Sequence, residues 1–214
     1  MSDLYVIRHC TNPLCDFRFP APEDGKSGLT CPTCKSRTLV VDRPRSEPGD
    51  YDDALGVQPQ RRVEVLLDNI RSIYNVGAIF RTSDGVGVQA LHLCGITATP
   101  EHPKLAKTAL GADEFIPWQH YRNSLTAVRT LKEKGYAIWG LENTVGSRNL
   151  LQDSELIARL DRPLLLIVGN EVTGIDPGLL DLCDETVALP MLGRKKSLNV
   201  TIAFGAAVYQ ILHT

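Results

Sequence analysis

Short apolar runs alternate with amphipathic stretches from residue 61 to the end of the chain. The runs are nearly continuous in Val, Leu, Ile and aromatic residues, as in strands that are buried on both faces of a parallel sheet. They span residues 63–70, 90–96, 114–118, 136–143, 163–171 and 186–191. Helical spacing predicts helices over residues 75–86, 103–111, 122–135 and 177–183, and from about Ser197 onward. This alternation predicts an α/β domain with a mostly parallel sheet.

Polar, glycine-rich segments follow directly after several of these runs. They are "DNIRSIYNVGAIFRTSDG", "LENTVGS", "VGNEVTGI" and "LPMLGRKKSLN". Ligands of such sheets bind beyond the carboxyl ends of the strands, so we expect the functional site in these segments. The chain has no G-x-G-x-x-G after the first strand and no G-x-x-x-x-G-K-[ST]. The main sequence evidence for a dinucleotide-binding site or a P-loop is therefore absent.

Length and charge narrow the class of protein further. A chain of 214 residues with 43% apolar content can bury the core of one ordinary domain and carry a small second one. The formal net charge is −2, so a nucleic-acid partner must be bound through local basic patches. No apolar run reaches the roughly 18–20 residues of a membrane helix, and the N-terminus does not resemble a signal peptide. We therefore expect a cytoplasmic protein with no membrane partner.

Four of the six cysteines lie near the N-terminus. They form a C-x4-C pair and a C-x2-C pair, Cys10, Cys15, Cys31 and Cys34. This is the arrangement of a zinc ribbon, in which two short loops point their thiolates at one tetrahedral ion. Because so short a segment has little core, we expect a zinc-ribbon-like domain over residues 1–42 that a structural zinc ion stabilises. Cys94 and Cys183 lie singly in apolar segments and are predicted to be buried thiols.

A segment rich in Pro, Asp and Gly follows the cysteine segment. Residues 43–60 show no apolar period and are predicted to be a linker. The larger domain is therefore expected over residues 61–214.

Three blocks of the larger domain are notable for their order and separation. They are "NVGAIFRTSDGVGV" (75–88), "LLLIVGNEVTGI" (164–175) and "LPMLGRKKSLNVTIAFGAAVYQI" (189–211). Together they resemble the three motifs of the SpoU (TrmH-like) RNA methyltransferases of the SPOUT superfamily. The segment 99–118 is also similar to that family. The resemblance covers residues 61–214 and leaves out the cysteine segment.

This resemblance implies a fold, an activity and an assembly. The fold is a sheet whose C-terminal part forms a deep trefoil knot, which hydrophobic periodicity does not predict and which is rare among folds. The activity is transfer of a methyl group from S-adenosyl-L-methionine to a ribose 2'-hydroxyl of tRNA or rRNA. The assembly is a homodimer in which the cofactor lies in the knotted loops and the active site is shared across the interface.

The resemblance places the catalytic residues in all three motifs: Asn75, Arg81, Glu171, Ser197 and Asn199. A guanidinium is a poor base at neutral pH, so we expect Arg81 to orient an RNA phosphate and to stabilise negative charge on oxygen. Asn75 is expected to hold the substrate or Arg81, and Glu171 to orient other side chains. Without the family, Arg81 would be an exposed helix residue, and Asn75 and Ser197 would be helix caps. Glu171 would then cap a turn.

The cofactor is expected to contact backbone atoms around Gly169 and apolar side chains of the third motif. The expected set is Thr144, Val168, Gly169, Asn170, Leu189, Met191 and Leu198. Glycines let the backbone approach a ligand closely, and pockets of this kind are mostly apolar with a few placed polar groups. Without the family, Leu189 and Leu198 would be read as core residues.

Basic residues near the third motif are candidates for RNA contacts. With one lysine from the segment 99–118, the candidates are Arg194, Lys195, Lys196 and Lys104. They would supply the local positive charge that the net charge lacks, although Lys104 also fits the solvated face of a helix. The cysteine segment adds Arg8, Arg18, Lys26, Lys35 and Arg37. We expect this segment to be a second RNA contact, with a stabilising or dimer-supporting role as the alternative.

A different class of function remains open. A non-catalytic RNA-binding or RNA-assembly factor could retain the same fold and the cysteine segment. The joint presence of the five expected catalytic residues favours the enzyme, because a binding protein does not need that set. A base nitrogen is a further possible methyl acceptor, and the SpoU-type motifs favour ribose instead.

Overall fold

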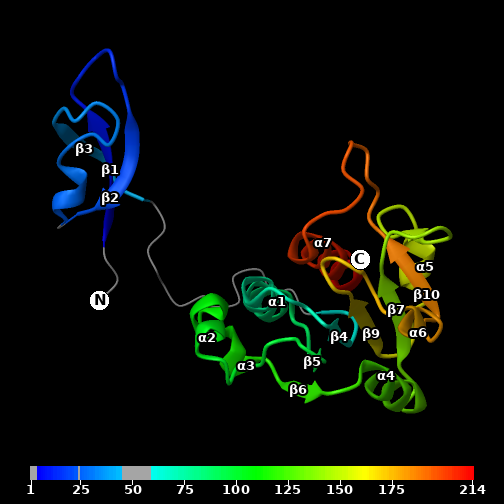
Figure 1. The fold of residues 1–214 in the computed structure, drawn as a ribbon. Coiled ribbons are helices and arrows are strands. Elements are labelled where there is room, and N and C mark those ends of the chain that lie inside the picture. Colours follow the sequence, from blue (N-terminus) through cyan, green and yellow to red (C-terminus); the bar gives the residue numbers. More distant parts are fainter. Residues whose placement is uncertain (1–3, 24, 45–58) are drawn as a thin grey trace. The chain divides into compact units, whose positions relative to one another are not determined.

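A computed structural model of the chain describes residues 4–23, 25–44 and 59–214 (Figure 1). The chain divides into two compact units, Met1–Gly56 and Val57–Thr214. Most of the predicted linker, residues 43–60, lies outside the described residues.

Three antiparallel strands form the N-terminal unit. β1 (Tyr5–Cys10) lies between β2 (Arg18–Pro22) and β3 (Thr38–Asp42), and a short 3-10 helix, η1 (Lys26–Gly28), follows β2. Its buried apolar side chains are few: Val6, Cys10, Ala21 and Cys31. So small a core indicates that further cross-links stabilise this unit.

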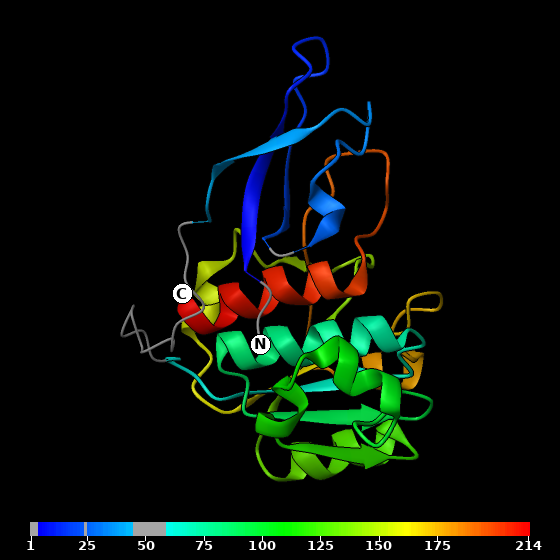
Figure 2. The same ribbon diagram turned by 90° about the vertical axis from the view of Figure 1, so that its left-hand side faces the viewer.

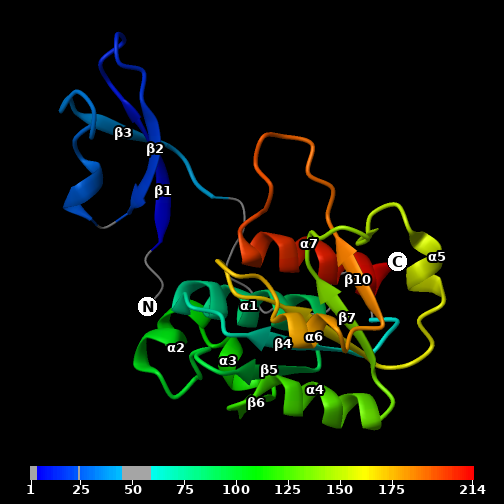
Figure 3. The ribbon, with the colours of Figure 1, turned by 45° about the vertical axis from the view of Figure 1, so that its right-hand side comes forward.

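Within residues 59–214, seven parallel strands form one sheet in the order β6-β5-β4-β9-β7-β10-β8 (Figure 3). The strands are β4 (Val63–Asp68), β5 (Ala90–Cys94), β6 (Trp118–Tyr121), β7 (Ala137–Leu141), β8 (Arg148–Asn149), β9 (Leu164–Val168) and β10 (Glu185–Ala188). Every residue of β4 and β9 is buried, because these central strands are covered on both faces. The predicted α/β architecture with a parallel sheet is confirmed.

Helices cover both faces of this sheet (Figure 2). They are α1 (Ile73–Val86), α2 (Pro103–Ala109), α3 (Ala112–Phe115), α4 (Ser124–Glu133), α5 (Ser154–Ala158), α6 (Pro177–Leu180) and α7 (Val200–His213). Side chains of α1, α2, α3, α5 and α7 share one core cluster, and those of α4 and α6 share the cluster on the other face. No helix among the described residues is both long and apolar enough to cross a bilayer.

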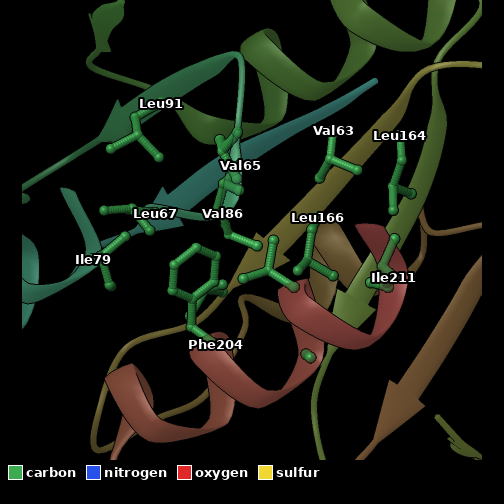
Figure 4. Close-up of a cluster of buried hydrophobic side chains, with 14 of the residues drawn as sticks. Val63, Val65, Leu67, Ile79, Val86, Leu91, Leu164, Leu166, Phe204 and Ile211 are labelled. Atoms are coloured by element: carbon green, nitrogen blue, oxygen red, sulfur yellow. The ribbon is translucent and has the colours of Figure 1, made fainter. Parts of the chain in front are cut away.

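Phe80 of α1 and Phe204 of α7 are fully buried in the larger cluster. Figure 4 shows Phe204 among Leu67, Ile79 and other side chains of the sheet and of α1. Burial of each ring stabilises the fold by about 1.5–3 kcal/mol. The start of α7 is thereby fixed beside the carboxyl ends of the strands, where a ligand site is expected.

The run 114–118 is not a strand, and that prediction is wrong in position. Glu114 and Phe115 end helix α3, and β6 begins only at Trp118. Phe115 is 74% exposed, so the apolar character of the run does not reflect burial in the sheet. A run this short carries too little periodicity to separate a strand from a helix end.

Candidate active site and metal centre

A cavity of about 430 Å³ lies at the carboxyl ends of β7, β9 and β10 and at the start of α7. It contains most of the residues that were expected to bind the cofactor: Val168, Gly169, Asn170, Leu189, Met191 and Leu198. It also contains Glu171, Ser197 and Asn199 of the expected catalytic set. Its volume falls within the roughly 300–1,000 Å³ of small-molecule sites.

The loop after β9 folds back tightly on itself beside this cavity. Asn170 N and Gly174 O pair at 3.0 Å, and Gly174 N and Asn170 O at 2.9 Å. Gly174 has φ +74°, which favours glycine, and a Cβ at Gly169 would lie 2.3 Å from the Ile175 nitrogen. The Asn170 Nδ2 atom donates to Asn69 O at 2.7 Å, which fixes the loop to the end of β4.

The Glu171 carboxylate joins this loop to the start of α1. It accepts hydrogen bonds from Arg71 N at 2.8 Å, Ser72 N at 3.0 Å and Asn75 Nδ2 at 2.8 Å. Partial burial raises the pKa of Glu171, but these hydrogen bonds outweigh it, so the pKa lies below the ordinary 4.5. Glu171 is therefore ionised at neutral pH and acts as an anchor for the first motif.

Asn75 also contacts the third motif. Asn199 Nδ2 donates to Asn75 Oδ1 at 3.4 Å, while Asn199 Oδ1 accepts from Thr201 N at 2.8 Å and caps α7. The cap of α1 is Ser72, whose side chain accepts from Asn75 N. Neither Asn75 nor Ser197 is therefore a cap residue, and Asn75 links all three motifs.

Arg81 lies apart from this network in the single chain. It is exposed on α1, six residues after Asn75, which is about 9 Å along the helix axis. Among the described residues it makes no hydrogen bond or ion pair, and it does not line the cavity. The cavity and the Arg81 guanidinium are thus two separate features of this chain.

The four basic residues of the C-terminal unit that were expected to bind RNA are all exposed. Arg194, Lys195 and Lys196 lie in the segment between β10 and α7, and Lys196 also lines the cavity. Lys104 lies on α2. Thr144 is exposed and does not line the cavity; its hydroxyl lies 3.0 Å from Ser147 Oγ.

Two polar side chains of the cavity were missed by the sequence interpretation. Glu142 and Asn143 follow β7 directly and line the cavity. The signal was present, because a polar pair immediately after a buried strand occupies the edge where ligands bind.

The four N-terminal cysteines converge in the structure. All four Sγ atoms lie within 4.8 Å of one another, with Cys10 and Cys34 at 3.4 Å and Cys15 and Cys31 at 3.8 Å. Four thiolates around a Zn²⁺ ion at about 2.3 Å would be about 3.8 Å apart, so the donor set fits this ion. The His9 Nε2 atom lies 2.6 Å from Asp16 Oδ1, and His9 is not a member of the cluster.

The charge of this cluster also fits a cation. Hydrogen bonds from Ser36 lower the pKa of Cys34 to about 6, which favours a thiolate. The neighbouring Cys34 and burial raise the pKa of Cys15 to about 12. Several thiolates this close repel one another unless a cation lies between them.

Comparison with known proteins places the C-terminal unit in a family. Residues 62–209 match the SpoU rRNA Methylase family, and the chain belongs to this family. It is 31% identical, over 161 residues, to the 23S rRNA (guanosine-2'-O-)-methyltransferase RlmB of Vibrio parahaemolyticus, covering 75% of this chain and 62% of that protein. It is 32% identical, over 170 residues, to an uncharacterised tRNA/rRNA methyltransferase of Synechocystis, covering 77% of this chain and 41% of that protein.

The fold is also similar to a solved structure. The TrmH/SpoU tRNA modifying enzyme of A. aeolicus gives a TM-score of 0.63 at 26% identity, covering 72% of this chain and 76% of that one. The chain thus spans less than two thirds of the two curated relatives and about three quarters of this structural neighbour.

Proposed function

We propose that this protein transfers a methyl group from S-adenosyl-L-methionine to a ribose 2'-hydroxyl of tRNA or rRNA. The network of Glu171, Asn75 and Asn199 carries the proposal, because it joins the three motifs of the family at the edge of one cavity. The name of the Vibrio relative, a guanosine-2'-O-methyltransferase, supports ribose as the acceptor.

The cavity has the chemistry that this cofactor requires. Leu189, Leu198 and Val168 supply apolar contacts for an adenine ring, and Gly169, which lines the cavity without a side chain, lets the cofactor approach the backbone closely. When bound, S-adenosyl-L-methionine supplies an electrophilic methyl group. The residues around it bind, orient and exclude water.

Methyl transfer forms a bond from carbon to the ribose oxygen, breaks the bond from carbon to sulfur and releases the hydroxyl proton. Arg81 is proposed to orient a phosphate of the RNA and to stabilise negative charge on the oxygen. The proton goes to the phosphate or to water. Asn75 and Asn199, held by Glu171, position the ribose, and Ser197 offers a hydroxyl in the cavity.

A homodimer is part of the proposal. The exposed face of α7 carries Ile202 and Tyr209, which are 59% and 51% exposed, with Ala206 between them. An apolar stripe at helical spacing on a surface favours an interface with a second copy. Such a dimer would bring Arg81 of one protomer to the cavity of the other and complete the site. The trefoil knot also remains a prediction from the family resemblance.

The cysteine cluster is proposed to hold a structural zinc ion, through Cys10, Cys15, Cys31 and Cys34. The unit around it is proposed to be a second RNA contact. Lys35 and Arg37 are exposed near the second cysteine pair. Arg8 is buried, and its Nε atom donates to Thr38 Oγ1 at 2.9 Å. It therefore stabilises the fold and is not proposed to contact RNA.

The proposal is tested by incubating the protein with tritiated S-adenosyl-L-methionine and total RNA from cells that lack its gene. Label in the RNA fraction is the expected result, and its size class identifies tRNA or rRNA. RNA binding without label, from a protein that also fails to bind the cofactor, would favour the non-catalytic RNA-binding factor.

A further inference from the structure

Glu142 and Asn143, at the end of β7, contact both loops that form the walls of the cavity. One wall is the loop after β9, which contains Gly169 and Glu171. The other is the segment 189–198 between β10 and α7, shown as the orange loop that joins them in Figure 3. The pair therefore lies where the two walls meet.

The Glu142 side chain holds the first loop. Its Oε2 atom accepts a hydrogen bond from Ile175 N at 3.0 Å, and its Oε1 atom accepts from Asn143 N at 3.2 Å. Gly174 packs directly against the carboxylate, and a Cβ at that position would lie only 2.4 Å from Oε2. The backbone is anchored as well, since Glu142 N donates to Val187 O of β10 at 3.0 Å.

The Asn143 side chain holds the second wall. Its Nδ2 atom donates to Lys196 O at 3.1 Å. Among the described residues, this is the only hydrogen bond that segment 189–198 makes. Its acceptor, Lys196 O, ends the basic run Arg194–Lys196 and directly precedes the cavity residues Ser197 and Leu198. One side chain thus fixes a segment that has a proposed RNA-contacting part and a cavity-lining part.

We propose that Glu142 and Asn143 are positioning residues that hold the two walls in the arrangement that binds the cofactor. This inference rests on the proposed function. Glu142 acts on the cofactor site, because its side chain holds the loop after β9 and, among the described residues, makes no hydrogen bond to segment 189–198. Asn143 acts on the cofactor site and on RNA binding together, because it fixes the segment that serves both.

The test uses Glu142→Gln and Asn143→Asp in the full chain. In Glu142→Gln, the side-chain amide group faces one of the two backbone N–H groups, of Ile175 or Asn143, and cannot accept its hydrogen bond. In Asn143→Asp, a carboxylate oxygen replaces the donor to Lys196 O, so that hydrogen bond is lost. Matched controls are Glu133→Gln, on the exposed face of α4, and Asn123→Asp, at the cap of α4, where Asp is equally suitable. Binding of S-adenosylhomocysteine is measured by calorimetry, RNA binding by filter retention, and folding by the thermal midpoint.

Glu142→Gln is expected to weaken S-adenosylhomocysteine binding by about 10-fold or more, since a hydrogen bond to a charged group is lost. Asn143→Asp is expected to weaken it roughly 3- to 10-fold, since a neutral bond is lost, and to weaken RNA binding as well. The thermal midpoint should stay near that of the controls. Amide exchange in segment 189–198 should rise in Asn143→Asp only.

Wild-type affinity in both variants would overturn the inference, as would a loss of affinity that parallels a fall in the thermal midpoint. A measurement on the wild type gives an independent answer: S-adenosylhomocysteine should slow amide exchange in segments 169–175 and 189–198 together. Protection of one segment alone would also overturn the inference. A wild type that does not bind S-adenosylhomocysteine would overturn the proposed function and this inference with it.

Discussion

The Asn75 amide donates to the Glu171 carboxylate at 2.8 Å, across 96 positions of the chain. The oxygen of the same Asn75 amide, Oδ1, accepts a hydrogen bond from Asn199 Nδ2 at 3.4 Å. These bonds set the orientation of the start of α1 relative to the loop after β9 and the start of α7. In the proposed enzyme, this fixed orientation places the ribose against the methyl group and lowers the barrier by alignment.

Replacement of Glu171 by Gln tests this arrangement. The amide can accept fewer of the three hydrogen bonds, so the start of α1 loses part of its anchor. We expect kcat/KM for RNA methylation to fall by roughly 10- to 100-fold, the equivalent of one hydrogen bond to a charged group. Steady-state kinetics check this, with Glu133→Gln on α4 as the control. An unchanged kcat/KM would mean that Glu171 does not orient the site.

Replacement of Arg81 by Ala tests the proposed electrostatic role. Arg81 does not line the cavity of its own chain and is proposed to contact the RNA and not the cofactor, so we expect unchanged binding of S-adenosylhomocysteine. The methylation rate should fall by about 10²- to 10³-fold, as when a donor to a developing oxyanion is removed. Arg129→Ala, an exposed arginine on α4, is the control. A variant that folds, binds cofactor and RNA and methylates at the wild-type rate would remove Arg81 from catalysis.

Replacement of Cys31 and Cys34 by Ser tests the metal centre. We expect loss of zinc, measured by mass spectrometry of the metal content, and unfolding of the β1–β3 sheet, because its own core is small. Affinity for S-adenosylhomocysteine should stay unchanged. If RNA affinity also stays unchanged, the N-terminal unit is not an RNA contact. Full retention of zinc would contradict the four-cysteine assignment.

The apolar stripe on α7 predicts the oligomeric state. Ile202→Asp places a charge in the proposed interface and should convert a dimer to a monomer, because an unpaired charge is costly to bury. Light scattering coupled to gel filtration measures the mass. Phe115→Asp, at an exposed position on α3, should leave the dimer intact. A wild type that is monomeric at micromolar concentration would contradict the shared site.

A buried carboxylate away from the cavity predicts acid sensitivity. Glu64 lies 2.8 Å from His92 Nε2 and accepts from Tyr136 at 2.6 Å and from Arg62 at 2.8 Å. Burial raises its pKa, but these hydrogen bonds together lower it from 4.5 to about 2. The lowered pKa contributes stability that is fully present above about pH 4.5 and is lost as the pH falls towards 2.

Glu64→Gln should therefore unfold with a free energy roughly 1–3 kcal/mol smaller at pH 7, since buried donors lose their acceptor. The difference from the wild type should shrink as the pH falls below 4.5. Urea unfolding at several pH values measures both. If the difference in the free energy of unfolding stayed constant over that range, protonation of Glu64 would not be coupled to unfolding.

The sequence predicted the class of fold and most of the cavity, because buried strands and the loops after them have strong local patterns. Contacts between distant segments were not predictable. Ser72, rather than Asn75, caps α1, and only the folded chain brings Glu171 to Asn75. The strand order follows from tertiary packing, and β8, with two residues, is too short to have a pattern. The position of Glu142 after β7 was a usable signal, but its contact with Ile175, 33 positions away, was not predictable.

The most direct test of the central claim is the identity of the methylated nucleoside. RNA labelled by the wild-type protein with tritiated S-adenosyl-L-methionine is digested to nucleosides, which are separated and identified by mass spectrometry. The account predicts that the label is in a 2'-O-methyl nucleoside and that its rate of incorporation falls by about 10²- to 10³-fold when Arg81→Ala replaces the wild type. Label confined to base-methylated nucleosides would contradict transfer to ribose.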